Sequence, residues 1–322
     1  MKFLNKLGLS IVTLLLVIVS IASAKDKIVV AQDGSGDYRT VQEAVNAVPD
    51  HSTKTVTIFI KNGTYKEKLT VPEGKNHITM IGESRDKTIL TYDDFASKPD
   101  AAGKNIGTSG SSSVFIFGDD FTAVNITFQN SAGPVGQAVA MRVTGTRAYF
   151  QNCAFLGFQD TLYTHGFGTV EFYRDCYIEG TVDFIFGAAT SWFENCSIFC
   201  KKGGGYASAA AQPDSVKYGY VFNNCHLSGD AAPQAFALGR PWRPYAKTVY
   251  INCDLGDRIS AKGWQEWSNE KDLSTTYYAE YKSKSTVTPQ RPAWTHQLTD
   301  AEAAVYTPAN VLGGWVPKVV KL

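Results

Sequence analysis

Hydrophobic residues along the chain occur in short runs rich in valine, isoleucine, phenylalanine and tyrosine. Glycine, asparagine and aspartate interrupt these runs at short intervals, as in "VTIFIKNGTY" and "AYFQNCAF". β-Branched and aromatic residues favour strands, and the interrupting residues favour turns. The pattern therefore predicts an all-β protein built from many short strands.

A repeat organises the strands in the middle of the chain. In six segments an asparagine or aspartate follows an apolar run, and in five of them the next residue is cysteine. The six polar residues, 20 to 29 positions apart, are Asn130, Asn152, Asp175, Asn195, Asn224 and Asn252. A repeat of this length made of short strands is typical of a parallel β-helix, in which each coil stacks on the previous one. A β-sandwich with coincidental Asn-Cys pairs is the alternative.

Both ends of the repeat region carry a helix-start pattern. "TVQEAVNAV" begins with Thr40 and Glu43, which have the spacing of a capping box, and its apolar residues then fall on one helical face. "TDAEAAVY", from Thr299, has the same capping spacing. We expect a short N-terminal helix that caps the solenoid and a C-terminal extension that packs on it.

Residues 1–24 have the layout of a secretory signal peptide. Lys2 and Lys6 accompany the apolar run "LGLSIVTLLLVIVSI", and "ASA" ends at Ala24. The apolar run is short for a membrane span, and an uncleaved anchor is the alternative. No linker divides the rest of the chain. We therefore expect residues 25–322 to form one secreted or periplasmic domain that has no membrane association after cleavage.

The charge balance and the spacing of cysteine and histidine argue against nucleic acid and zinc as partners. The formal net charge is +1, so no basic field indicates nucleic acid. The six cysteines and five histidines show no zinc-site spacing. We expect a monomer without a metal or an organic cofactor.

The repeat also places candidate catalytic groups in register. Asp160 and Asp183 each lie eight residues after a repeat residue, and Gln137 and Gln159 each lie seven after one. If no insertion shifts the coils, each pair stacks at about 5 Å. Two carboxylates among apolar side chains do not both ionise readily, which separates an acid from a base or nucleophile. Neutral amides suit an oxyanion. A polar ladder that only stabilises the solenoid is the alternative.

The segment "LGRPWRPY" supplies a cation for this face. Arg240 can form a forked ion pair with a carboxylate and keep it ionised. Candidate platforms for sugar rings are Tyr163, Trp242, Trp264 and Trp267. Aromatic residues more often lie in a core, so each has that alternative.

Five motifs in order make the sequence resemble the pectin methylesterase (pectinesterase) family. They are "GTYKE" (63–67), "GQAVAMR" (136–142), "QDTLY" (159–163), "VDFIFG" (182–187) and "LGRPW" (238–242). The resemblance runs from "DGSGDYRTVQEAVNAVP" to "NVLGGW". It implies a right-handed parallel β-helix that uses water to hydrolyse methyl esters of galacturonate in pectin (homogalacturonan), releasing methanol.

The resemblance also implies roles for individual residues. Asp183 matches the nucleophile, Asp160 the general acid/base, and Arg240 the arginine that positions the nucleophile. Gln137 and Gln159 match the oxyanion-hole amides. Trp242 and Trp264, the latter in "GWQEW", match substrate-contacting aromatic residues. We also expect Tyr163, Phe184 and Thr108 to bind substrate.

Two features leave alternatives open. "GTSGSSSVF" has Gly110 where the family has an aromatic residue, so one sugar subsite differs. Other functions for the same fold are a β-helix pectate lyase, a glycoside hydrolase, or a carbohydrate-binding protein without catalysis.

Cys176 and Cys196 occupy corresponding places in neighbouring coils. Stacked Cα atoms at strand spacing fall within disulfide range, although side-chain direction can forbid the bond. The pair is therefore either a disulfide or two buried thiols.

Overall fold

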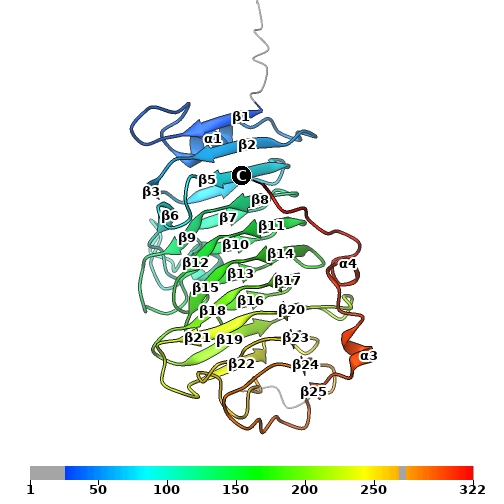
Figure 1. The fold of residues 1–322 in the computed structure, drawn as a ribbon. Coiled ribbons are helices and arrows are strands. Elements are labelled where there is room, and N and C mark those ends of the chain that lie inside the picture. The colour runs from blue at the N-terminus through cyan, green and yellow to red at the C-terminus, as the bar shows by residue number, and fades with distance from the viewer. Residues whose placement is uncertain (1–25, 268–272, 322) are drawn as a thin grey trace, which may run out of the picture.

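The computed structural model describes residues 26–267 and 273–321 and is a parallel β-helix (Figure 1). The expected signal peptide, residues 1–24, lies outside the described residues. Three parallel sheets run along the solenoid, and each coil adds a strand to the preceding coil. The prediction of an all-β solenoid is confirmed. In the described part of the chain, no helix is long and apolar enough to cross a membrane.

Sheet 1 has eleven strands and extends from one end of the solenoid to the other. In spatial order its strands are β1 (Lys27–Val30), β2 (Val56–Ile60), β5 (Ile78–Gly82), β8 (Thr122–Val124), β11 (Ala148–Gln151), β14 (Val170–Arg174), β17 (Thr190–Glu194), β20 (Tyr220–Asn223), β23 (Lys247–Ile251), β24 (Tyr277–Tyr281) and β25 (His296–Gln297).

Sheets 2 and 3 have seven strands each. Sheet 2 consists of β4 (Leu69–Val71), β7 (Val114–Ile116), β10 (Met141–Val143), β13 (Leu162–Thr164), β16 (Ile185–Gly187), β19 (Gly205–Ala210) and β22 (Phe236–Pro241). Sheet 3 consists of β3 (Gly63–Lys66), β6 (Thr88–Tyr92), β9 (Thr127–Asn130), β12 (Ala154–Leu156), β15 (Tyr177–Gly180), β18 (Ser197–Cys200) and β21 (His226–Gly229).

Identical positions of successive coils form ladders inside the solenoid. A stack of rings runs through Phe150, Tyr173, Phe193, Phe222 and Tyr250, with neighbouring ring centroids 4.3–4.9 Å apart. Aromatic pairs in such contacts stabilise beyond the apolar area that they bury. The ladder therefore fixes the register of sheet 1, because a slip of one residue would turn these rings to the outer face.

The polar repeat residues form the turn that follows each strand of sheet 1. Asn152, Asp175, Asn195, Asn224 and Asn252 all have positive φ angles, from 48° to 54°. Asparagine and aspartate tolerate this left-handed conformation better than other side chains.

Asn130 was wrongly assigned to this ladder. The residue stacked beneath Asn152 is Asn125, which has φ 56° and accepts a 2.7 Å hydrogen bond from the Asn152 amide. Asn130 ends β9 in sheet 3 instead. Gln137 lies 12 residues after Asn125, whereas Gln159 lies 7 residues after Asn152. The longer coil contains five extra residues before Gln137, which equals the separation of five positions between Asn125 and Asn130 and so offsets the error.

The cysteines of the repeat point inward, one residue after each of these turns. The structure has Cys176 and Cys196 as free, buried thiols, so the disulfide alternative is wrong. The Cys176 thiol lies 3.5 Å from the Phe150 carbonyl oxygen, and the Cys196 thiol lies 3.5 Å from the Tyr173 carbonyl oxygen. The Cys176 thiol also lies 3.3 Å from the Arg174 carbonyl oxygen, and the Cys196 thiol 3.5 Å from that of Glu194, so each thiol has backbone acceptors both in its own coil and in the coil beneath.

Both predicted end structures are present. Helix α1 (Val41–Ala47) has the capping box of Thr40 and Glu43 and buries its apolar face against the first coils (Figure 1). The capping box of Thr299 and Glu302 starts α3 (Asp300–Ala303), and α4 (Pro308–Val311) follows.

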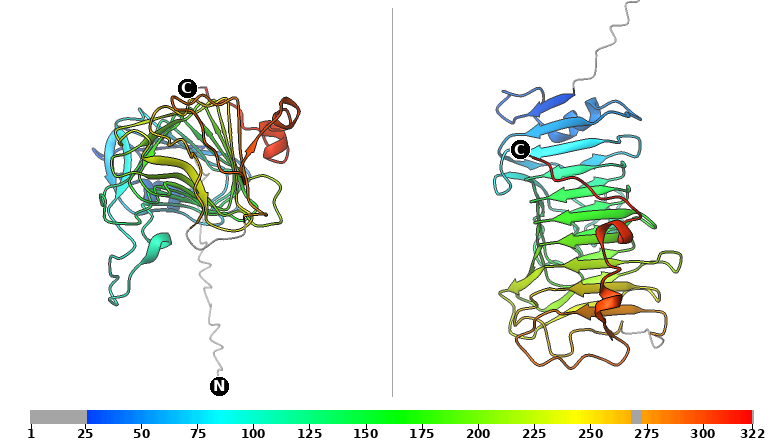
Figure 2. Two further views of the ribbon diagram at one scale, coloured as in Figure 1. Left: turned by 90° about the horizontal axis from the view of Figure 1, so that it is seen from below. Right: turned by 45° about the vertical axis from the view of Figure 1, so that its right-hand side comes forward.

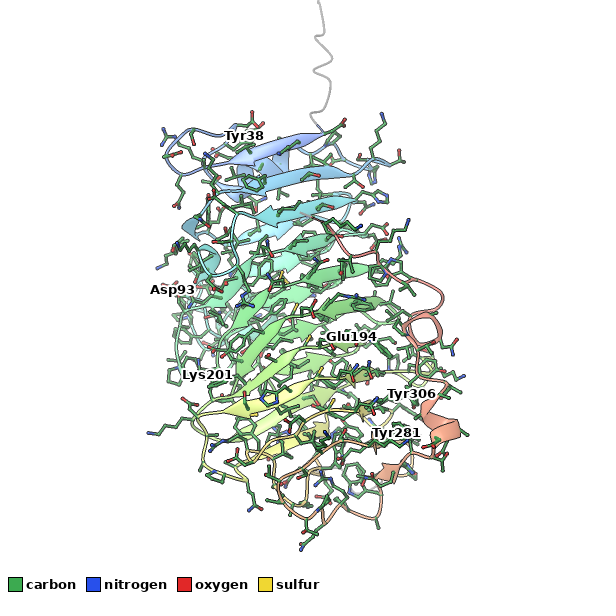
Figure 3. All side chains as sticks on the ribbon, viewed as in Figure 1. Tyr38, Asp93, Glu194, Lys201, Tyr281 and Tyr306 are labelled. Atoms are coloured by element: carbon green, nitrogen blue, oxygen red, sulfur yellow. The ribbon has the colours of Figure 1, made fainter. Side chains whose placement is uncertain are left out.

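The C-terminal segment packs along the outer face of sheet 1 (Figures 1 and 2). It covers outward-facing apolar residues of the sheet, among them Tyr149, Phe172 and Trp192. Tyr281, labelled beside α3 in Figure 3, donates a 2.7 Å hydrogen bond to Asp300. This segment therefore occupies the outer face of sheet 1 and leaves the outer face of sheet 2 free.

Candidate active site

A cavity of about 550 Å³ lies over the outer face of sheet 2. Tyr163 of β13, Phe186 of β16, Ala209 of β19 and Arg240 of β22 line its floor in neighbouring strands. The cavity is therefore elongated across the strands. One wall is formed by α2 (Gly107–Gly110), on a segment that projects from the solenoid (Figure 2).

Asp160 and Asp183 occupy equivalent positions just before β13 and β16. The Asp160 amide donates to the Val182 carbonyl at 3.0 Å, and Leu162 donates to Phe184 at 2.8 Å, so the two coils stack without a shift. Both aspartates have positive φ angles, 64° and 51°. Such conformations gather at functional sites, where the surrounding structure holds them in place.

Arg240 holds Asp183 through a forked ion pair. Its Nε and Nη2 atoms donate to the two carboxylate oxygens at 2.9 and 2.7 Å. The guanidinium lies between two rings, 3.9 Å from the Tyr206 centroid and 4.1 Å from the Trp267 centroid. A planar cation clamped in this way fixes both the position and the orientation of the Asp183 carboxylate.

The environments of the two carboxyl groups differ. Burial raises the pKa of Asp183, while the hydrogen bonds and charge of Arg240 act in the opposite direction. Burial also raises the pKa of Asp160, well above its usual range, and the neighbouring Asp183 charge raises it further. Within the described residues no cation forms an ion pair with Asp160. The two environments thus favour the proton on Asp160 and the negative charge on Asp183.

The two glutamines lie beside the carboxyl groups, as predicted. Gln137 and Gln159 form a parallel bridge between neighbouring coils, and both line the cavity. Thr108, Tyr163 and Trp242 line it as well. The Tyr163 and Phe186 rings stack with centroids 4.2 Å apart, and Trp242 packs against both. An apolar wall thus faces the polar groups.

Two residues expected to contact substrate lie elsewhere. Phe184 is fully buried in the core together with Ile185, whereas Phe186 faces the cavity, because the left-handed turn at Asp183 breaks the alternation that would have placed Phe184 outward. Trp264 is only 1% exposed, and its indole nitrogen donates to Glu280 at 2.9 Å. Trp267, three residues further on, lines the cavity in its place.

Sequence reasoning missed the ring of Tyr206, which stacks on Arg240. Tyr206 lies on β19 and pairs with Ala237 of β22, three positions before Ala209, which pairs with Arg240. Strand register does not identify Tyr206, because Tyr206 pairs with Ala237 and not with Arg240, and no local motif marks it. The glycine that ends the "VDFIFG" motif has a structural reason. Gly187 has φ 129°, and a Cβ there would lie 2.1 Å from the Thr164 carbonyl oxygen, so no other residue fits.

Comparison with known proteins gives a consistent result. The profile of the Pectinesterase family matches residues 27–315. Pectinesterase 31 of Arabidopsis thaliana is 41% identical over 281 residues, which cover 85% of this chain and 88% of that protein. Other relatives are longer: the chain covers 53% of Probable pectinesterase/pectinesterase inhibitor 58 of Arabidopsis thaliana, at 41% identity.

Solved structures agree with this match. Pectin methylesterase from carrot has a TM-score of 0.80 and 35% identity, and the similarity covers 92% of this chain and 98% of that one. Pectin methylesterase PemA from Erwinia chrysanthemi has a TM-score of 0.79 and 30% identity, covering 91% and 98%.

Fold and cleft together define a parallel β-helix protein with a paired-aspartate site. The chain belongs to the pectinesterase family, and its reaction is the de-esterification of pectin.

Proposed function

We propose that the chain hydrolyses the methyl esters of galacturonate residues in homogalacturonan, with Asp183 as the nucleophile and Asp160 as the general acid and base. The observation that carries this assignment is the forked Arg240–Asp183 ion pair beside the buried Asp160 carboxyl group, which has no such partner among the residues that the structure describes. The pair supplies one ionised and one protonated aspartate at adjacent positions.

In the first half of the reaction, an Asp183 oxygen attacks the ester carbonyl carbon. The carbonyl oxygen becomes an oxyanion, and the side-chain amides of Gln137 and Gln159 donate hydrogen bonds to it. The carbon–oxygen bond to the methoxy group then breaks, and Asp160 gives its proton to the departing methanol. An anhydride between Asp183 and the galacturonate remains.

In the second half, water takes the place that methanol has left. Asp160 is now ionised and accepts a proton from the water as it attacks the anhydride carbonyl. The same two amides stabilise the second oxyanion. Cleavage of the bond to Asp183 regenerates its carboxylate on the arginine and releases the galacturonic acid group, which gives its proton to the solvent, while Asp160 keeps the proton that it accepted from water.

Gln137→Ala should lower kcat for methanol release by about 10²–10³-fold, because one preorganised oxyanion donor is lost. The fold should persist, since Gln137 is exposed at the cavity and packs in no core cluster. Gln129→Ala, on sheet 3, is the matched control and should retain normal kcat. Equal kcat values for Gln137→Ala and Gln129→Ala would show that Gln137 does not stabilise the oxyanion.

The pH profile of kcat/KM should be bell-shaped. Activity falls at low pH as Asp183 gains a proton, and it falls at high pH as Asp160 loses one. Burial raises the pKa of both groups, so both limbs lie above the pH range of ordinary aspartates. Arg240→Gln should move the low-pH limb to higher pH, because the pKa of Asp183 then loses the effect that opposes burial. Methanol release measured across pH checks both statements, and an unmoved limb in Arg240→Gln would contradict the second.

The products distinguish the proposed reaction from its alternatives. The purified protein is incubated with highly methylated pectin in the presence of a chelator, and methanol, reducing ends and ultraviolet absorbance are followed together. The esterase reaction releases methanol alone. New reducing ends would indicate a glycosidase, absorbance from unsaturated product would indicate a lyase, and no change would indicate a binding protein.

Residues 1–24 are proposed to be a cleaved signal peptide, which supports export as a secreted or periplasmic enzyme. Residues 25–322 are proposed to act as one domain and as a monomer. The polymeric substrate also supports export, because a polysaccharide does not cross the cell membrane and an enzyme meets it outside the cell.

A further inference from the structure

We infer that Asn130 is a positioning residue, which holds the oxyanion donor Gln137 in place by joining it to the projecting segment, residues 94–111. This segment leaves the solenoid (Figure 2), and residues 106–109 of it line one side of the cavity. The inference rests on the proposed function, because it concerns the same reaction. Asn130 lies outside the turn ladder of sheet 1, so turn formation does not account for its side chain.

Gln137 lies on an irregular segment, residues 131–140, that connects β9 to β10. Gly133 and Gly136 in this segment have φ angles of 85° and 99°. Glycine adopts such angles at little cost, and it leaves the backbone around it permissive. The coil that carries Gln159 is five residues shorter before its glutamine. The position of Gln137 therefore depends more on contacts with other segments than the position of Gln159 does.

The Asn130 side chain binds three parts of the backbone at once. It is only 3% exposed. Its amide nitrogen donates to the carbonyl oxygens of Asp94 at 2.8 Å and Val139 at 3.0 Å, and it lies 3.2 Å from that of Ser111. Buried carbonyl groups need such partners, and each one left unsatisfied is costly. Both ends of the projecting segment and the backbone just after Gln137 therefore meet at one buried amide.

The projecting segment also contacts the backbone at Gln137 directly. The Ala96 amide donates to the Gln137 carbonyl oxygen at 2.8 Å, and the Val139 amide donates to the Ser111 hydroxyl oxygen at 3.1 Å. A side chain that must donate to an oxyanion needs its backbone fixed, because a misplacement of about 1 Å can cost about 10²-fold in rate. Asn130 thus acts on catalysis through the projecting segment and the Gln137 backbone.

The test is a double-mutant cycle on methanol release from highly methylated pectin. Asn130→Ala should lower kcat by about 10²-fold, because Gln137 is no longer held at the oxyanion. In a Gln137→Ala background the same substitution should change kcat by less than about twofold, since the donor that it positions is already gone. In a Gln159→Ala background it should still cost about 10²-fold. Full, independent losses in the Gln137→Ala background would overturn the inference.

Ser111→Ala is a milder variant of the same connection. It removes the hydroxyl that accepts from Val139 and leaves the Asn130 amide in place. It should lower kcat by about tenfold, in line with the loss of one buried hydrogen bond, and this loss should also disappear in the Gln137→Ala background. If Asn130→Ala does not fold, Ser111→Ala decides the question by the same criterion.

Gln212→Ala is the matched control. Gln212 is likewise buried, at 1% exposed, and its amide group donates to the Ala189 carbonyl oxygen at 3.0 Å and accepts from the Lys247 amide at 3.0 Å. Its variant should lower the thermal midpoint, as Asn130→Ala does, but keep kcat within about twofold of the unmodified protein. Equal losses of kcat in Gln212→Ala and Asn130→Ala would show that general destabilisation is the cause, and the inference would be wrong.

Limited proteolysis gives a measurement that does not depend on activity. Lys104 is exposed on the projecting segment. Cleavage by trypsin after Lys104 should be about tenfold faster or more in Asn130→Ala, because the ends of the segment are released, and unchanged in Gln212→Ala. An unchanged rate in Asn130→Ala would contradict the inference. Failure of the proposed function is separate: the unmodified protein would then release no methanol, whereas the cleavage rate is measured without substrate.

Discussion

Asp183→Asn is expected to release methanol from pectin at least about 10³-fold more slowly than the unmodified enzyme, because removal of a nucleophile abolishes the covalent route. The amide has nearly the shape of the carboxylate, so the cavity is preserved. Arg240 loses its ionised partner, and breaking a buried pair costs about 3–5 kcal/mol of stability. The measurement is kcat on highly methylated pectin, with the thermal midpoint recorded beside it.

Asp175→Asn is the control for this variant. Asp175 occupies the same kind of left-handed turn, and its neighbours in that ladder are already asparagines. It is exposed and lies away from the cavity, so kcat should not change. Near-normal methanol release by folded Asp183→Asn would exclude Asp183 as the nucleophile.

Asp160→Asn should lower kcat by about 10²–10⁴-fold, the usual contribution of a positioned proton donor. The loss should depend on the leaving group. Methanol leaves poorly without a proton, whereas the anion of an acidic phenol leaves without one. An aryl ester of oligogalacturonate should therefore acylate Asp183 in the variant at a rate close to normal.

Hydrolysis of the acyl-enzyme still needs Asp160 as a base. The variant should thus release one equivalent of the phenol in a burst and then turn over slowly. Stopped-flow absorbance measures both phases. A variant that loses methyl and aryl esters equally, without a burst, would show that Asp160 has another role.

The repeat in the sequence was sufficient to predict the solenoid, because each coil buries the same positions. The prediction that Asp160 and Asp183 stack was also correct, because their two coils have the same number of residues between the turn after sheet 1 and the start of sheet 2. The prediction that Gln137 and Gln159 lie side by side was correct only because two differences in the coil cancel. Asn130 was the wrong reference, and the five-residue insertion before Gln137 compensates for the error.

Side-chain direction was the part that the sequence could not supply. Phe184 belongs to the motif that contains Asp183, yet the left-handed turn at Asp183 breaks the alternation of the strand, and Phe184 lies in the core beside Ile185. Trp264 and Trp267 lie three residues apart in an irregular segment, where no period decides which one faces the cleft. Cys176 and Cys196 occupy corresponding places in neighbouring coils, but both are free thiols with backbone carbonyl acceptors in their own coil and in the coil beneath.

The C-terminal segment changes how the solenoid responds to stress. In a solenoid each coil contacts mainly its neighbours, so the end coils can in principle detach one at a time. Here β25 pairs with β24, while Val320 exchanges hydrogen bonds of 2.8 and 3.0 Å with Gln151, 169 positions earlier in the chain. Coils at the end of the stack are thereby tied to coils in its middle. Unfolding is thus expected to be cooperative across this half of the molecule, with detachment of the last coil requiring release of the whole segment.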